Sequence, residues 1–555
     1  METVGPVSWT ANNVTVESVK SVIHVPEVDI PNGSQQASPL KGVATDEIVS
    51  FLAQFWEQFH PTFPILHRRT FKVPQYFEDN VLIHIMCSIG AKYVKGRNSF
   101  SDDCFTYCVD YFDRILSSLD PQSVSIDIFQ AGLIAGYSGL FWGKSGWYKW
   151  ASGFIYQLML IARESGMFQH APIAAEAAKT NWQLFLTLEL SRRSSYALFF
   201  IDGQMCTLLN NPPKMSHYEI KHVLPCHEDL WEASELEWQE ISKNLSKDNK
   251  ITEYGLEFMK GSPGVHFLEA LQQTLICGSA PPQTSSFGGM IILLAIHIMI
   301  RNMTQFAGIL ETCYALAQDP FSRRSQLGNA LDGLRFLIPR RKSEDGHHMK
   351  EMWGLFEATL NLALIHLHIP DTAITSGIVE PDLGSTIATA AALTQPQSII
   401  PPGTAFLGNE LSKFPYETLA LVTGHISYFM KTFNPEFHET NPLLTYMFYK
   451  VSLVTWLVLR FLINRTHANM ENRERKQSCD AGFQSPLDPK QLQQEFMMKH
   501  LAVEILSHVD NSDKFSDIQC FERWIESQLA SFDTWGIGEC GSMSFNDMLI
   551  IGESL

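Results

Sequence analysis

Four charged residues lie in a stretch that is otherwise largely apolar, and they are the residues of this sequence best suited to chemistry: Glu189, Arg192, Arg193 and Asp202. Glu189 and Arg193 are four residues apart, so on a helix the carboxylate and the guanidinium would meet on one face. An arginine side chain can bond a carboxylate at two points and also stack on aromatic rings. The four residues therefore predict either a structural salt-bridge network or the charged edge of an effector pocket. We favour the structural network, because buried Arg–Glu pairs more often specify packing than bind ligands.

The sequence around these charges is typical of a helix followed by a loop that proline fixes. Apolar residues between Leu184 and Phe200 recur near the 3.6-residue period of a helix. The pattern breaks at residues 210–213, Asn-Asn-Pro-Pro, and resumes before Leu224 and Pro225. If the charges form a structural network, we expect it to hold the loop at 210–213 against the helix.

No catalytic or metal-binding pattern emerges in the rest of the sequence. Residues 143–145, Gly-Lys-Ser, match the end of a phosphate-binding loop, but the full pattern requires a glycine where Ser138 stands. His366 and His368 are two residues apart, which does not place two metal ligands on one helix face. The G-x-S-x-G nucleophile motif is absent. We therefore predict no catalytic, cofactor-binding or metal-binding residue, and an α-helical enzyme is the least favoured class of protein.

Charge and cysteine usage argue against a chain built mainly to bind nucleic acid. Lys and Arg number 41 against 59 Asp and Glu, which gives the 555 residues a net charge of -18. Affinity for duplex DNA depends on Lys and Arg that neutralise phosphates, so this balance is unfavourable. The ten cysteines form no C-x-x-C pair, and this favours buried reduced thiols over a zinc site.

Two apolar runs need testing as membrane spans. Residues 290–300 are too few for the ~20 residues that cross a bilayer. Residues 445–463 are long enough but include Lys450 and Arg460, and charges are costly inside a membrane. Both runs predict buried helices of a soluble core, so we expect no membrane association. The N-terminus lacks a basic region followed by an apolar one, so we expect no secretion signal either.

The periodicity of the whole chain predicts an all-α, multihelical, bundle-like domain. Apolar residues follow helical spacing from Asp46 onward, and no segment alternates as a strand does. We expect helices near residues 102–118, 124–138, 148–166, 181–202, 265–277, 288–317, 414–431, 443–463, 489–509 and 517–529.

The predicted division of the chain has four parts. Residues 1–44 include Pro26, Pro31 and Pro39 and no long periodic segment, which predicts a flexible leader. Residues 45–235 form the predicted core, and the polar residues 236–264 predict an exposed connector or a ragged helix. Residues 265–555 form a C-terminal helical part of the same regulatory region, with loops near 338–350, 370–405 and 465–488.

The ordered string from residue 182 to residue 231 resembles the regulatory domain of fungal-specific transcription factors. In that family a Trp precedes E-x-x-R-R, an apolar stretch leads to an Asp, a proline loop follows, and the segment ends in L-P-C-x-E-x-L-W. The residues that match this motif here are Trp182, Glu189, Arg192, Arg193, Asp202, Pro212, Pro213, Leu224, Pro225 and Trp231. Residues 51–67 also resemble the opening element of the family, and the resemblance covers roughly residues 46–235.

The resemblance implies a nuclear regulator of transcription, often of one pathway or gene cluster, that receives signals or partners through this domain. Its expected partners are other transcription factors or co-regulators, as a homo- or hetero-dimer, and any contact to DNA is either direct or through such a partner. The members it most resembles have two-cysteine two-histidine zinc fingers ahead of the domain, and this sequence contains none. Two alternatives follow. The chain is a co-regulator without DNA binding, or a truncated gene model whose fingers, and their zinc, lie upstream of Met1. We otherwise expect no cofactor.

Overall fold

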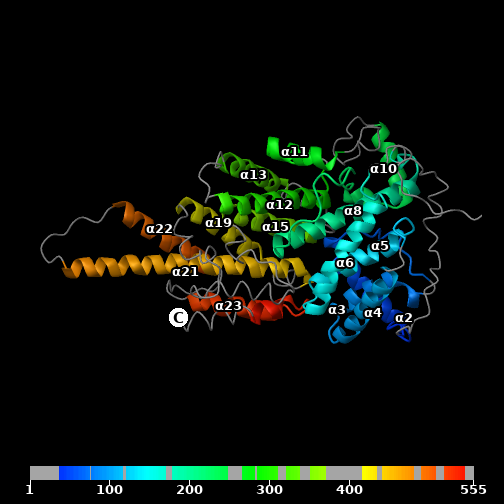
Figure 1. Cartoon of the computed structure of the whole chain (residues 1–555), viewed down its shortest axis with the longest axis horizontal. Coiled ribbons are helices and arrows are strands. Elements are labelled where there is room, and N and C mark those ends of the chain that lie inside the picture. The colour runs from blue at the N-terminus through cyan, green and yellow to red at the C-terminus, as the bar shows by residue number, and fades with distance from the viewer. Residues whose placement is uncertain are drawn as a thin grey trace, which may run out of the picture. The chain divides into compact units, whose positions relative to one another are not determined.

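The computed structural model describes residues 37–543 except for 75–76, 117–119, 170–174, 176–177, 248–264, 282–283, 311–319, 338–349, 370–415, 434–439, 480–488 and 508–517. The regular elements of these described residues are all helices, apart from an isolated antiparallel bridge between Val223 and His266 (Figure 1). The all-α prediction is therefore confirmed.

The chain divides into two compact units, each made of several segments. The first unit consists of Met1–Cys206, Asn211–Met299 and Phe321–Glu357, and the second of Thr207–Asn210, Ile300–Pro320 and Ala358–Leu555. The first unit thus includes residues on both sides of the connector expected at 236–264.

The N-terminal helices of the first unit are α2 (Thr45–Gln54), η1 (Phe55–Phe59), η2 (His60–Thr62), η3 (Phe77–Asp79), α3 (Val81–Lys92), α4 (Asn98–Leu116), α5 (Ile126–Leu140) and α6 (Ser145–Glu164). The helices that follow along the chain are α8 (Trp182–Leu208), α9 (Glu228–Trp231), α10 (Glu235–Lys247), α11 (Phe267–Cys277), α12 (Ser286–Leu310), α13 (Pro320–Arg335) and α15 (Lys350–His368). The second unit contains α19 (Tyr416–Thr432), α21 (Pro442–Cys479), α22 (Pro489–Leu506) and α23 (Ile518–Ser531).

Helix α3 is the central helix of the N-terminal part of the first unit. Asn80 caps it by accepting a 3.1 Å hydrogen bond from the Ile83 amide, as short polar side chains do at helix starts. Its residues from Val81 to Ala91 are all buried, because α2, α4 and α5 pack around it. Gly90 permits the closest of these contacts, since a Cβ atom there would lie 1.9 Å from the Phe51 carbonyl oxygen.

In the second unit α21 packs against α19, α22 and α23. Its N-terminal half is buried, and Trp456 donates a 2.7 Å hydrogen bond to the Glu522 carboxylate on α23. Two stretches, Ser286–Gln305 and Pro442–Ile463, are long and apolar enough to cross a membrane, and 83% of each tested window is buried inside the protein. This burial is what we expect of the core helices predicted from the sequence.

The structure corrects two of the predicted boundaries. Leu40 is fully buried and the Ser38 hydroxyl lies 2.9 Å from the His84 ring, so the packed part of the chain begins inside the leader expected at 1–44. Helix α21 continues to Cys479 through the first part of the loop expected at 465–488. Residues 464–479 are polar, but they lack Gly and Pro and are rich in good helix formers. The helix therefore continues through this segment.

Two further expectations can be compared only in part. Helix α10 occupies Glu235–Lys247, so the ragged-helix alternative holds for the first half of the connector expected at 236–264. The remainder of that connector, the loop expected at 370–405 and nearly all of the loop expected at 338–350 lie outside the described residues.

Candidate functional site

The charged motif lies on helix α8, within the first unit. The Asn181 side chain accepts a 3.0 Å hydrogen bond from the Leu184 amide and so starts the helix. Glu189 and Arg193 are fully buried, and Arg192 is 6% exposed. A charge in such a place is costly unless it is paired and hydrogen-bonded. Each of these three buried side chains therefore needs hydrogen-bond partners within the protein.

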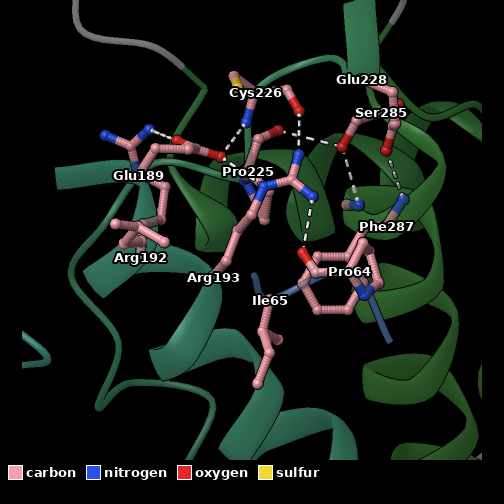
Figure 2. A network of polar contacts seen from close by, with 12 residues as sticks. Pro64, Ile65, Glu189, Arg192, Arg193, Pro225, Cys226, Glu228, Ser285 and Phe287 are labelled. Carbon is pink, nitrogen blue, oxygen red and sulfur yellow. Dashed lines mark hydrogen bonds and ion pairs between the residues drawn. The ribbon is translucent and has the colours of Figure 1, made fainter. Parts of the chain in front are cut away.

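Glu189 accepts hydrogen bonds at both carboxylate oxygens (Figure 2). Its Oε1 accepts from Arg193 Nε at 3.0 Å and from the Cys226 backbone amide at 2.9 Å. Its Oε2 accepts from Arg192 Nη1. Burial raises the pKa of Glu189, but the two guanidinium groups and the Cys226 amide outweigh it and hold that pKa below its ordinary value. The carboxylate is therefore ionised in the fold.

Arg193 bonds two further parts of the chain besides Glu189. Its Nη1 donates to the Pro64 carbonyl oxygen at 3.2 Å, and its Nη2 donates to the Cys226 carbonyl oxygen at 2.9 Å (Figure 2). Its Cζ lies 4.4 Å from the ring centroid of Trp231, close enough for a cation–π contact. One side chain thus joins α8, the segment after η2 and the segment before α9. We name Glu189, Arg192, Arg193 and their bonded partners the Arg193 network.

A second buried carboxylate extends the Arg193 network to α12. Glu228 accepts from the Ser286 hydroxyl at 2.7 Å and from the backbone amides of Ser286 and Phe287 at 3.3 Å. Figure 2 shows Glu228 beside Phe287. A carboxylate at a helix N-terminus satisfies amides that have no partner within the helix and interacts well with the helix dipole. The Ser285 hydroxyl also donates to the Pro225 carbonyl oxygen at 3.0 Å. Residues 225–228 are therefore bonded to both α8 and α12.

The two tryptophans of the motif belong to one aromatic cluster, which reaches the Arg193 network through Trp231. Trp182 and Trp231 are 5% and 1% exposed, and both rings contact His67, at centroid distances of 5.7 and 4.9 Å. Trp238 of α10 packs against Trp182 at 5.6 Å. Trp231 thus covers one face of the Arg193 guanidinium, and the other rings of the cluster pack behind it.

Asp202 does not belong to the Arg193 network. Its carboxylate accepts hydrogen bonds of 2.9–3.0 Å from the backbone amides of Lys214 and Met215, just after the proline loop. Burial raises the pKa of Asp202 to about 6, although these two amides act to lower it. Pro212 is exposed and Pro213 half-buried, so the prolines shape the loop rather than fill the core.

This arrangement corrects the connection that we expected between the charges and the loop. We expected one network to hold residues 210–213. Of the three charged residues Glu189, Arg193 and Asp202, however, Asp202 bonds the residues just after that loop, whereas Glu189 and Arg193 bond Cys226. The charges of the motif thus form two separate networks on one helix.

A groove of about 680 Å³ lies between the end of α11 and α13, and no residue of the motif lines it.

Sequence reasoning missed several of the groups that complete the Arg193 network: Pro64, Cys226, Glu228, Ser285 and Ser286. Two of them, Pro64 and Cys226, act through backbone atoms, which leave no signal in residue type. Glu228 did have a signal, because an acidic residue at the start of a short helix favours capping. Among the described residues no three His, Cys, Asp or Glu side chains are grouped as metal ligands would be.

Similarity to a known family defines the class of protein. Residues 52–336 match the fungal specific transcription factor domain, and they include the whole of the Arg193 network. The chain belongs to this family.

Its similarity to individual proteins is distant. A zinc finger protein of Schizosaccharomyces pombe is 23% identical over 301 residues, which are 52% of this chain and 46% of the relative. A transcription factor of Gibberella fujikuroi is 23% identical over 36% of this chain and 27% of the relative, and klf1, a zinc finger protein of S. pombe, is 22% identical over 48% and 33%. The chain therefore matches less than half the length of each of these relatives. No solved structure matches it.

Proposed function

We propose that this chain regulates transcription in a fungus and that it does so through the helical domain described here. The observation that supports the proposal is the family match over residues 52–336, which spans the entire Arg193 network. The family is one of transcription factors, which points away from an enzyme. We further propose that the protein acts in the nucleus on the genes of one pathway or cluster.

Within that function we assign the motif a structural role rather than a place in an effector pocket. Glu189 uses both carboxylate oxygens on groups of its own chain, and Arg193 uses three nitrogens in the same way. A ligand could therefore bind Glu189 or Arg193 through these groups only if buried hydrogen bonds within the chain were broken. The network instead fixes residues 225–228 between α8 and α12.

We propose that the chain reaches DNA through other transcription factors or co-regulators. Its net charge of -18 supports this, because acidic chains are repelled by the phosphate backbone. The alternative, a regulator whose own zinc fingers precede this sequence, is supported by the names of two relatives as zinc finger proteins. A transcript map of the 5′ end of the gene separates the two.

The direct test is a tethering assay in a fungal host. The full chain is fused to an unrelated DNA-binding module that recognises sites upstream of a reporter gene, and the module alone is the control. We expect the fusion to change reporter output several-fold in either direction, and the tagged native protein to lie in the nucleus. Unchanged output from a folded, nuclear fusion would refute the proposed function.

A further inference from the structure

The first described residues of the chain include a turn at Ser38–Val43, and we name these residues the docked turn. Backbone hydrogen bonds of 3.1 and 3.2 Å close it. Leu40 is 0% exposed and so anchors the turn, whereas Lys41 is exposed. The Ser38 side chain is half-buried, and its Oγ lies 2.9 Å from Nε2 of His84 on α3. One apolar side chain and one hydroxyl thus hold the docked turn on the first unit.

The hydrogen bond between Ser38 and His84 has a fixed direction. Nδ1 of His84 lies 2.8 Å from the Asn80 carbonyl oxygen, which can only accept, so Nδ1 carries a proton. Burial lowers the pKa of this ring to about 4, although the Asn80 carbonyl and the Asp79 carboxylate act to raise it. The ring is therefore neutral at physiological pH, and its Nε2 has no proton. The Ser38 hydroxyl donates its own hydrogen to Nε2.

A phosphate group on Ser38 is incompatible with this arrangement. Phosphorylation replaces the hydroxyl hydrogen, so the bond to Nε2 is lost and oxygen lone pairs face a nitrogen lone pair. The phosphate also adds a charge of about −1.5 to −2 at pH 7. Among the described residues, the charged group that acts on His84 is the acid Asp79, which repels a phosphate. The Tyr107 ring stacks on His84 at 4.1 Å and holds the imidazole in place. The docked turn therefore fits a serine with a free hydroxyl and not its phosphate ester.

The sequence of the docked turn is one that a protein kinase recognises. Ser38 is followed by Pro39, and Lys41 stands three residues after the serine. Proline-directed kinases select such a serine, because proline has no N–H that an apolar subsite would leave unpaired, and a basic residue at the third position pairs with acids of the kinase. Of the three Ser-Pro pairs in the sequence, at positions 38, 262 and 485, only the first has a basic residue at that position.

We propose that Ser38 is a phosphorylation site for a proline-directed kinase and that the phosphate releases the docked turn from the first unit. The γ-phosphoryl group of MgATP passes to Ser38 Oγ. The bond from the γ-phosphorus to the ADP oxygen breaks, the bond to Oγ forms, and the hydroxyl proton leaves to the catalytic base of the kinase.

The kinase modifies the docked turn while it is open, because a kinase binds its substrate segment in an extended form. A turn held by so few contacts opens locally without unfolding the domain. The phosphate then prevents the turn from closing again. This inference is independent of the proposed transcriptional function, since both the modification and the release are measured on the purified chain.

Phosphorylation of the purified full chain tests the first step. With MgATP and a cyclin-dependent kinase, mass spectrometry should find phosphate on Ser38, and Lys41→Ala should slow the modification several-fold. Leu40→Ala keeps the kinase motif but removes the anchor of the turn, so it should speed the modification, with synthetic peptides of the two sequences as the reference rates. A wild-type chain that stays unmodified at Ser38, or a rate that Leu40→Ala does not raise, would overturn the proposal.

Hydrogen exchange of the phosphorylated chain tests the second step. Phosphorylation of Ser38 should speed exchange of the amides of the docked turn by about tenfold or more, while α5 keeps its protection. Ser38→Ala is the matched control, because it removes the hydroxyl without adding charge, and its smaller increase reports the lost hydrogen bond alone. Equal or slower exchange after phosphorylation would mean that the phosphate pairs with a protonated His84 and tightens the turn, which contradicts release. Faster exchange throughout α5 would also overturn the proposal, because the phosphate would then unfold the whole unit.

Discussion

At the scale of single residues, Arg193 shows why a buried charge can be stable. Its guanidinium bonds Glu189, Pro64 and Cys226 and stacks on Trp231, so its lost hydration is replaced in several directions at once. Burial lowers the pKa of Arg193, but Glu189 and the other nearby acids raise it above its ordinary value. The side chain is therefore charged at every physiological pH, and its partners are fixed in number and direction.

Removal of this side chain should be severe. We expect Arg193→Ala to lower the free energy of unfolding by about 3–5 kcal/mol, because it leaves a buried carboxylate poorly paired. Urea unfolding of the purified chain, followed by circular dichroism, measures the loss. Arg163→Ala is the control, since the bridge of Arg163 to Glu219 is partly exposed and should be worth about 1 kcal/mol or less. Equal losses for the two variants would contradict the special role of Arg193.

At the scale of elements, close helix packing depends on a glycine. We expect Gly90→Ala to destabilise the protein by about 1–3 kcal/mol or more, because the new methyl group would overlap the Phe51 carbonyl and push α2 away from α3. Gly153→Ala on α6 is the control. That position is open, and alanine should stabilise the helix by roughly 0.5–1 kcal/mol. Thermal unfolding of both variants tests the prediction, and it is wrong if Gly90→Ala melts at or above the wild-type temperature.

The elements also show what the sequence can and cannot predict. The start of helix α8 was predictable because its apolar residues repeat with the helical period from Leu184 to Phe200, but the helix continues past the predicted end at residue 202 to Leu208. The end of α21 was not, because a polar segment can be either a loop or an exposed helix. The assignment of Asp202 and Glu189 to separate networks was also beyond the sequence, since charges on one helix say nothing about which distant backbone amides they meet.

At the scale of the whole molecule, three buried histidines should make stability depend on pH. Burial lowers the pKa of His60 to about 3 and the pKa values of His67 and His84 to about 4. The unfolded chain takes up these protons near pH 6.5 and the folded chain does not. This contribution to stability is therefore complete above pH 6.5 and is lost as the pH falls towards 4.

Asp202 acts in the opposite direction over part of this range. Its pKa is raised to about 6 in the fold, so its contribution is complete below its unfolded value near 3.8 and is lost as the pH rises through 6. The effect of the three histidines is larger than that of one carboxyl. Together the four groups should lower the free energy of unfolding by about 3 kcal/mol when the pH falls from 7.5 to 5.5. Urea unfolding at the two pH values measures the total change, to which the lowered pKa values of His217 and His366 also add. His60→Gln should reduce the difference by about 1.4 kcal/mol. An unchanged difference in that variant would refute the assignment.

The acidic charge of the molecule leads to a prediction about DNA. We expect the purified chain of this sequence not to bind duplex DNA specifically, because a net charge of -18 opposes contact with phosphates. A gel-shift assay at physiological salt with fragments of candidate promoters tests this. A nanomolar complex with one promoter that survives nonspecific competitor would show that the chain reads DNA itself.

We propose that the Arg193 network is a scaffold on which transcriptional output depends. The tethered reporter tests this proposal when its output is divided by the amount of folded protein. Arg193→Ala should lower abundance and output together, leaving their ratio unchanged. Replacement of both Glu189 and Arg193 by apolar residues of similar size should restore part of both quantities. If Arg193→Ala instead keeps wild-type stability and abundance but loses output, the network is a sensor surface and the claim is wrong.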